Sequence, residues 1–273
     1  GQENVLGEDM PLWFGPMFRD GMVSKSNFTG NSQHSQNAYK YDKLHMPADV
    51  AYPYFYNAHN SIYWQNLNTP AIFGDSGIIS GKHDGMCIAD MSTVNPNSTK
   101  EISESVISNG IDYLEIPVMG GPNVAIMGKL VMMASGPKDS FDQCKTIFEK
   151  IANKVFFLGE QGTANSIKLA MNLQITMLAL SLSEGITLVE KSKVDPKIFL
   201  QVLNSTYFKT GMSENKAFKM IEGNYDATFT LANLKKDITT MTNTAKDLGI
   251  ELPMISKAEE IYKNAINEGL GDL

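Results

Sequence analysis

The sequence predicts an α/β domain followed by an all-helical domain that is linked to it through one long helix. From about Gly74 onward, short apolar runs alternate with helical segments, which is typical of an α/β domain. The strand signals stop after Gly162, and residues 164–190 then show helical periodicity with apolar residues almost all round. A chain of 273 residues is also too long for one minimal domain. We therefore expect domains at 1–162 and 163–273.

The expected elements follow from apolar periodicity and from capping residues. Apolar runs that end in loops predict strands at 86–89, 113–119, 130–134 and 155–158. Helical periodicity predicts helices at 96–109, 137–153, 164–190, 231–248 and 253–267, with others that begin at Asp195–Pro196 and Gly211. The apolar surface of 164–190 indicates a helix that is buried on most sides.

Residues 1–70 differ in composition from the rest of the chain. They hold three of the four His residues, and no Ile occurs before Ile62. The Val/Ile runs that are expected of buried parallel strands are therefore missing. This segment alone predicts no fold.

Composition and charge exclude several classes of protein. The 42% hydrophobic and 19% charged content is that of a globular protein. A net charge of −7 argues against a nucleic-acid surface. The longest uncharged apolar stretch, 169–182, contains four polar residues, so we expect no membrane span. Cys87 and Cys144 have no paired spacing and no signal-peptide pattern is present, so we expect a reducing compartment, the cytoplasm.

Two polar residues near the start of the long helix are candidates for chemistry. Lys168 and Asn172 are four residues apart and project from one face, where we expect a cleft between the domains. A partly desolvated lysine can act as a general acid, although the spacing alone favours an ordinary solvated helix turn. Gly159 and Gly162 allow another backbone or a ligand to approach this helix start closely.

Polar and glycine residues also follow two expected strands. Met119, Gly120 and Gly121 end one strand at the carboxyl edge, where open parallel sheets bind ligands and glycine amides can hold an anion. An ordinary strand-to-loop turn is the simpler interpretation of a glycine pair. Ser92 and Thr93 follow another strand, and their hydroxyls serve either a ligand or a helix cap.

Two further groups carry little signal by themselves. Lys236 and Asp237 lie inside the expected helix 231–248, where such a pair is usually a solvated face. The four His residues show no metal-ligand spacing and no Cys clusters with them, so we expect no metal site.

Five motifs occur in a fixed order: DMST at 90–93, PVMGG at 117–121, GKLVMMASG at 128–136, GEQGTANSIKLAMN at 159–172 and LKKD at 234–237. Together they resemble the β-hydroxyacid dehydrogenase family, which includes 3-hydroxyisobutyrate dehydrogenase, tartronate semialdehyde reductase and the glyoxylate or succinic semialdehyde reductases. The resemblance covers roughly 74–273. It implies a Rossmann domain for NAD or NADP, a helical domain, and hydride transfer between nicotinamide and a short 3-hydroxy acid or its aldehyde.

The resemblance implies a substrate site. Lys168 matches the catalytic lysine, which donates a proton to the carbonyl oxygen, and Asn172 matches the residue that hydrogen-bonds the substrate. Gly120 and Gly121 match the loop whose amides hold the substrate carboxylate. Met119 stands where the family usually has Ser, so one substrate hydrogen bond is absent.

The resemblance also implies a cofactor site. Thr93 matches the threonine near the nicotinamide, and Lys236 matches the lysine that closes over cofactor and substrate. The glycine-rich pyrophosphate turn of the family falls on NVLGEDM, at Leu6 and Gly7. Asn27 lies near the position where an acid favours NAD and an Arg favours NADP, but the sequence supplies neither charge there, so both cofactors stay open.

Several alternatives remain open. The chain is either the enzyme or a non-catalytic relative that serves as a dimerisation or tetramerisation module, as in the nuclear glyoxylate-reductase-like proteins. An imine-reducing relative is a third possibility, and retention of Lys168 weighs against both alternatives. Residues 1–70 form either a divergent, cofactor-free domain or a segment whose residues are wrongly identified. Peptide sequencing of this segment distinguishes the two.

The expected partners are a small carboxylate substrate and further copies of the chain. The apolar surface of the long helix suits domain exchange in a homodimer or homotetramer. The resemblance also implies one more short helix after GLGDL, so we expect the carboxy terminus to be incomplete.

Overall fold

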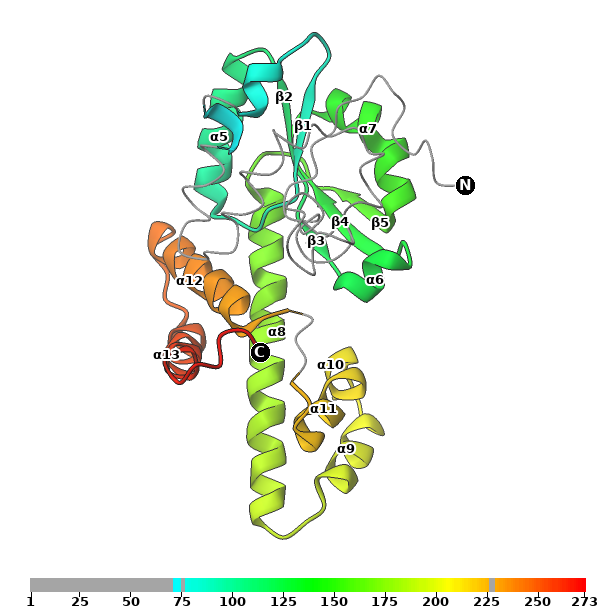
Figure 1. Cartoon of the computed structure of the whole chain (residues 1–273), viewed down its shortest axis with the longest axis vertical. Helices are drawn as coiled ribbons and strands as arrows, with labels where there is room; N and C mark the ends of the chain where they lie inside the picture. Colours follow the sequence, from blue (N-terminus) through cyan, green and yellow to red (C-terminus); the bar gives the residue numbers. More distant parts are fainter. Residues whose placement is uncertain (1–70, 75–76, 226–228) are drawn as a thin grey trace, which may run out of the picture. The chain divides into compact units, whose positions relative to one another are not determined.

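The computed structural model describes residues 71–74, 77–225 and 229–273, so the expected cofactor positions Leu6, Gly7 and Asn27 lie outside the described residues. The chain divides into two compact units after Lys168. The first described unit is α/β and the second is helical, as the sequence predicts (Figure 1).

The α/β unit contains strands with helices between them. In chain order its elements are η4 (Ile78–Gly81), β1 (Cys87–Asp90), α5 (Pro96–Ser108), β2 (Asp112–Glu115), β3 (Val118–Met119), α6 (Pro122–Ile126), β4 (Leu130–Ala134), α7 (Lys138–Ile151), β5 (Ala152–Phe157) and the start of α8 (Thr163–Lys191). The predicted strand at 130–134 is confirmed, and the predicted helices at 96–109 and 137–153 are confirmed to within two residues.

The single strand that we expect over 113–119 is wrong, because two strands with different partners occupy this stretch. β2 pairs in parallel with β1, whereas β3 pairs antiparallel with β4. Pro117 lies between them and has no N–H for a ladder, which explains the interruption. The apolar pattern runs on across the break, so it does not show the change of partner.

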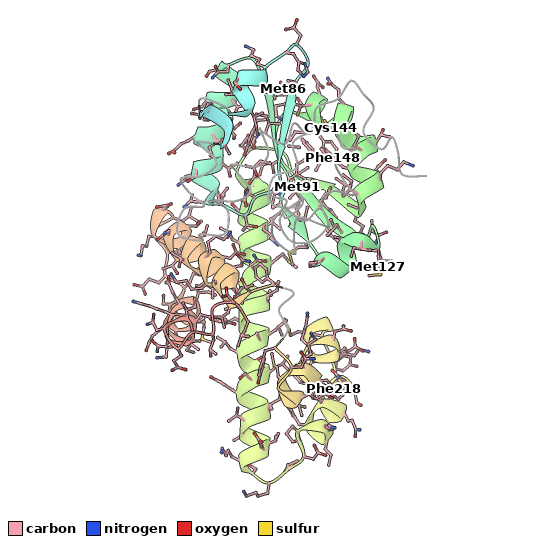
Figure 2. All side chains as sticks on the ribbon, in the orientation of Figure 1. Met86, Met91, Met127, Cys144, Phe148 and Phe218 are labelled. Atoms are coloured by element: carbon pink, nitrogen blue, oxygen red, sulfur yellow. The ribbon has the colours of Figure 1, made fainter. Side chains whose placement is uncertain are left out.

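The strands form two sheets, because β4 also pairs in parallel with β5, which gives the orders β1-β2 and β3-β4-β5. A backbone bridge between Glu115 and Ser135 joins the two sheets. Glu115 N donates to Ser135 O at 3.0 Å, and Ser135 N donates to Glu115 O at 2.8 Å. The ends of β2 and β4 therefore lie side by side. Cys144 and Phe148 of α7 are buried in the core beneath these strands (Figure 2).

The helical unit packs around the long helix α8. Its other elements are α9 (Pro196–Asn204), α10 (Gly211–Asn215), α11 (Ala217–Glu222), α12 (Leu231–Asp247) and α13 (Pro253–Asn267). All but α11 begin where the sequence predicts. The first half of α8 packs with α12 and α13 around Leu169, Ile238 and Ile255, and its second half packs with α9 to α11 around Leu182 and Leu200 (Figure 1).

The expectation that 164–190 is buried on most sides is wrong for the single chain. Met171 and Leu188 of α8 are 42% and 69% exposed, because neighbouring helices cover only part of its circumference. By length and composition α8 is also the one helix in the described ranges that could cross a membrane. That is weak evidence, since the core helix of a soluble protein passes the same test.

Candidate active site

The amine of Lys168 lies against the segment that contains β3. Lys168 Nζ donates to the carbonyl of Val118 at 2.7 Å and lies 3.0 Å from the sulfur of Met119. The lysine side chain is half-buried. The structure thus brings together two of the predicted site residues, Lys168 and Met119. The two acceptors orient the ammonium group at the end of β3.

Gly120 and Gly121 form an exposed turn directly after this contact. Gly120 has φ +127°, and a Cβ there would lie 2.8 Å from Leu130 Cδ2 and 2.9 Å from Val124 Cγ1. Both the conformation and the lack of space therefore require glycine. Gly121 is extended and precedes α6, with open space where its Cβ would be.

Side chains that are distant in the sequence cap the start of α8. Gly162 N and Asn165 N each donate at 2.7 Å to one carboxylate oxygen of Glu115. Ala164 N donates to the hydroxyl of Ser135 at 3.0 Å. Neither Glu115 nor Ser135 is among the site residues predicted from the sequence. The signal that could have found Glu115 is its acidic side chain inside the predicted strand 113–119, whose other residues carry no charge.

The environment of the Glu115 carboxylate contains opposing influences. Burial raises the pKa of Glu115 above the usual carboxyl value, and this effect outweighs the hydrogen bonds from Asn165 and Gly162, which lower it. The residue is 1% exposed. Its interaction with the positive end of α8 compensates part of the cost of burial.

The loop after β1 belongs to the same polar network. Asn165 Oδ1 accepts from Val94 N at 3.0 Å, and Asn165 Nδ2 donates to Thr99 Oγ1 at 3.3 Å. Thr93 is half-buried in this loop. The buried hydroxyl of Ser92 forms no hydrogen bond with any described residue. A buried polar atom of this kind at the carboxyl edge of a strand fits a ligand rich in polar groups, such as a dinucleotide.

Asn172, Lys236 and Asp237 form a second polar group, within the helical unit. Asn172 Nδ2 donates to Asp237 Oδ2 at 2.7 Å, and both residues are buried. Lys236 forms an ion pair with Asp237. The interpretation of Lys236 and Asp237 as a solvated helix face is therefore wrong, since Asp237 is 3% exposed. The predicted residues Asn172 and Lys236 share one carboxylate.

Neither a metal-binding cluster nor a reactive thiol lies among the polar site residues that the structure describes. The residues that the structure describes contain no cluster of three or more His, Cys, Asp or Glu side chains that could hold a metal ion. Cys87 and Cys144 are free, buried and members of one core, although they are distant in the sequence. A hydrogen bond with Cys144, together with burial, raises the pKa of Cys87, so its thiol stays protonated.

Family models and solved structures match both units. The NAD binding domain of 6-phosphogluconate dehydrogenase matches residues 66–159, and the NAD-binding domain of NADP-dependent 3-hydroxyisobutyrate dehydrogenase matches residues 162–273. A 3-hydroxyisobutyrate dehydrogenase from Salmonella typhimurium is similar with a TM-score of 0.70 and 22% identity, over 76% of this chain and 73% of that one. Psf3 in complex with NADP+ and 2-OPP is similar with a TM-score of 0.74 and 17% identity, over 96% of each chain. At these identities the structures show the fold alone.

Among the curated relatives is the cytokine-like nuclear factor N-PAC of Aedes aegypti. It is 29% identical over 200 residues, which are 73% of this chain and 36% of that protein. The chain spans about a third of the length of the curated relatives it matches. The two family models in succession show that this chain belongs to the β-hydroxyacid dehydrogenase family, in which a Rossmann-type domain for NAD or NADP precedes a helical domain.

Proposed function

We propose that the chain is an NAD(P)-dependent oxidoreductase that interconverts a short-chain 3-hydroxy acid and its semialdehyde, or reduces glyoxylate or succinic semialdehyde. The observation that carries this proposal is the position of the Lys168 amine, which contacts Val118 O and Met119 Sδ directly before the exposed Gly120–Gly121 turn. An oriented amine beside a glycine turn suits proton transfer to a carbonyl oxygen and binding of an anion.

In the proposed reaction, each site residue has a separate role. A reduced nicotinamide held near Thr93 and Lys236 would supply the hydride for the carbonyl carbon. Lys168 donates a proton from Nζ to the carbonyl oxygen, and in the oxidative direction it accepts that proton back. The amides of Gly120 and Gly121 hold the substrate carboxylate. Asn172, which is oriented by Asp237, hydrogen-bonds the substrate.

Three further positions bear on the choice of ligand. Thr93 lies near the nicotinamide in this proposal, and Lys236 closes over the cofactor and substrate. Met119 offers a thioether where a hydroxyl would supply a hydrogen-bond donor, so the substrate depends more on the glycine turn and on Asn172.

The test is a comparison of wild type with Lys168→Ala. NADPH and NADH binding is measured by fluorescence titration, and turnover with succinic semialdehyde, glyoxylate and 3-hydroxyisobutyrate. We expect turnover to fall by about 10²- to 10⁴-fold in the variant while nucleotide binding is retained, since general acid catalysis contributes a factor of this order. Lys154→Ala is the matched control, because Lys154 is an exposed lysine of β5. Equal turnover in wild type and Lys168→Ala would contradict the proposal.

A second candidate function is a non-catalytic oligomerisation module of the dehydrogenase fold. The match to N-PAC, a nuclear factor by its name, favours this candidate. A wild-type protein that binds neither nucleotide, turns over none of the three substrates and forms a stable oligomer would support the module and contradict the enzyme.

We also propose that the protein is a cytoplasmic homodimer or homotetramer. The helical unit supports association, because Leu188, Val202 and Phe208 are large apolar side chains that are 69%, 60% and 76% exposed. Light scattering of wild type and Val202→Asp tests this proposal. A monomeric wild-type protein would contradict it.

A further inference from the structure

The buried carboxylate of Glu115 has no part in the chemistry proposed above, yet it is the main contact at the start of α8. Its two oxygens accept one hydrogen bond each, from Gly162 N and Asn165 N, both at 2.7 Å. The first amides of a helix have no partners within the helix. Glu115 therefore provides, from another part of the chain, the hydrogen-bond acceptors that a local capping residue usually provides.

The chain segment that begins with Glu115 contacts α8 a second time, one turn further on. Val118 O accepts from Lys168 Nζ at 2.7 Å. Val118 lies three residues after Glu115, and Lys168 lies three residues after Asn165. Two contacts between the same two segments restrict both the rotation of α8 about its axis and its position along that axis.

Ser135 adds a third contact from the neighbouring strand. Its hydroxyl accepts from Ala164 N at 3.0 Å, and its backbone forms the bridge with Glu115. Both residues are buried, at 0% and 1% exposure. The two backbone hydrogen bonds between Glu115 and Ser135 therefore fix the carboxylate and the hydroxyl relative to each other at the start of α8.

We propose that Glu115, supported by Ser135, is a positioning residue for Lys168, which holds the start of α8 so that the amine reaches the end of β3. This inference rests on the proposed role of Lys168 in proton transfer. In Glu115→Gln one carboxylate oxygen is replaced by an NH2 group that cannot accept from a backbone amide, so one capping hydrogen bond is lost and the other loses its charge. The first turn of α8 can then shift, which carries Lys168 Nζ away from Val118 O. A displacement of about 1 Å at a catalytic group can cost about 100-fold in rate.

The first readout is independent of turnover. In the full chain, wild type, Glu115→Gln and Asp112→Asn are acetylated with an amine-reactive ester, and mass spectrometry gives the rate at Lys168 relative to exposed Lys154. We expect at least a threefold faster relative rate in Glu115→Gln. Asp112 is the matched control, since this exposed carboxylate of the same strand accepts a hydrogen bond from Ser140 of α7.

The second readout is steady-state kinetics of the same variants. We expect kcat to fall by about 10- to 100-fold in Glu115→Gln, with KM and nucleotide affinity within about twofold of wild type. A purely structural cap would lower the amount of folded protein without this division between kcat and KM. If the Gln variant does not fold, Ser135→Ala removes only the hydroxyl contact and carries the same two readouts with smaller changes.

The outcomes separate this inference from the proposed function. Faster acetylation of Lys168 together with a lower kcat supports both. Faster acetylation in a protein whose wild type shows no turnover keeps Glu115 as the residue that positions Lys168 and overturns the enzymatic proposal. An unchanged acetylation rate in a folded variant overturns the positioning role, whatever the turnover.

Discussion

The starts of α5 and α8 are capped in different ways. At α5 the cap is local, because Asn95 Oδ1 accepts from Asn97 N at 2.8 Å and Pro96 occupies the first helical position. At α8 the acceptors come from Glu115, which is 47 and 50 residues away from the two amides that it binds, and from Ser135, which is 29 residues away from its amide. A local cap stabilises its own helix, whereas a distant cap also fixes the helix to the sheet.

This difference decides what each helix start can control. Loss of the cap at α5 frays one turn of a helix that the core still holds through Ile102 and Val106. Loss of the cap at α8 releases the turn that precedes Lys168. The distant cap therefore couples the position of a candidate catalytic residue to the end of β2.

The largest expected effect is that of Glu115→Ala. The substitution leaves two buried amides, Gly162 N and Asn165 N, without acceptors, so we expect the free energy of unfolding to fall by about 3 kcal/mol. Urea denaturation of the full chain measures this loss. A loss no greater than that of Asn95→Ala would show that the distant cap contributes no more than the local one.

Gly162→Ala should come next. Gly162 has φ +90°, and a Cβ there would lie 2.9 Å from Lys100 Cε and 3.2 Å from Pro96 O, so both strain and a close contact with α5 oppose the substitution. We expect a loss of about 2 kcal/mol. Gly159→Ala is the control, since Gly159 has φ +88° with open space around the added Cβ, and its loss should be about 1 kcal/mol. Equal losses of stability in the two variants would show that the contact with α5 does not contribute to the cost of Gly162→Ala.

Asn95→Ala should have a smaller effect. It removes one side-chain acceptor at α5, which typically costs about 1 kcal/mol, while Asn95→Ser keeps an acceptor and should lose less. Both values come from the same denaturation experiment. Neither variant should change the rate of Lys168 acetylation, and a change there would contradict the separation of the two helix starts.

The same contrast explains which parts of the structure could be predicted from the sequence. The starts of α5 and α13 were predictable because Asn95–Pro96 and Pro253 lie at the helix ends themselves, and the start of α12 because its amphipathic pattern begins at Leu231. The break between β2 and β3 was not predicted, although Pro117 marks it in the sequence, because the largely apolar pattern continues on both sides of the proline.

The candidate site shows the same division. The resemblance to a family identified Lys168, Asn172 and the glycine turn. Glu115 was missed and Asp237 was taken for part of a solvated helix face, because each acquires its role from a partner that lies 47 to 65 residues away in the chain. Residue patterns show periodicity and local caps, but they do not show which distant amide a buried carboxylate will meet.

The smallest expected effect is a pH dependence that belongs to α8 and not to α5. Because the folded-state pKa of Glu115 is raised above its ordinary value of 4.5, the folded chain holds this proton more tightly than the unfolded chain. Stability therefore falls as pH rises from that value through the raised pKa, and the loss is complete above it.

Glu115→Gln has no proton to lose, so the stability of wild type relative to this variant should be higher at pH 4 than at pH 8. Asn95→Ser should show no such trend relative to wild type, because neither side chain titrates. Urea denaturation of the three proteins at both pH values measures the two differences. A relative stability of wild type that rises with pH would mean that the amides of α8 hold the carboxylate more strongly than burial opposes it.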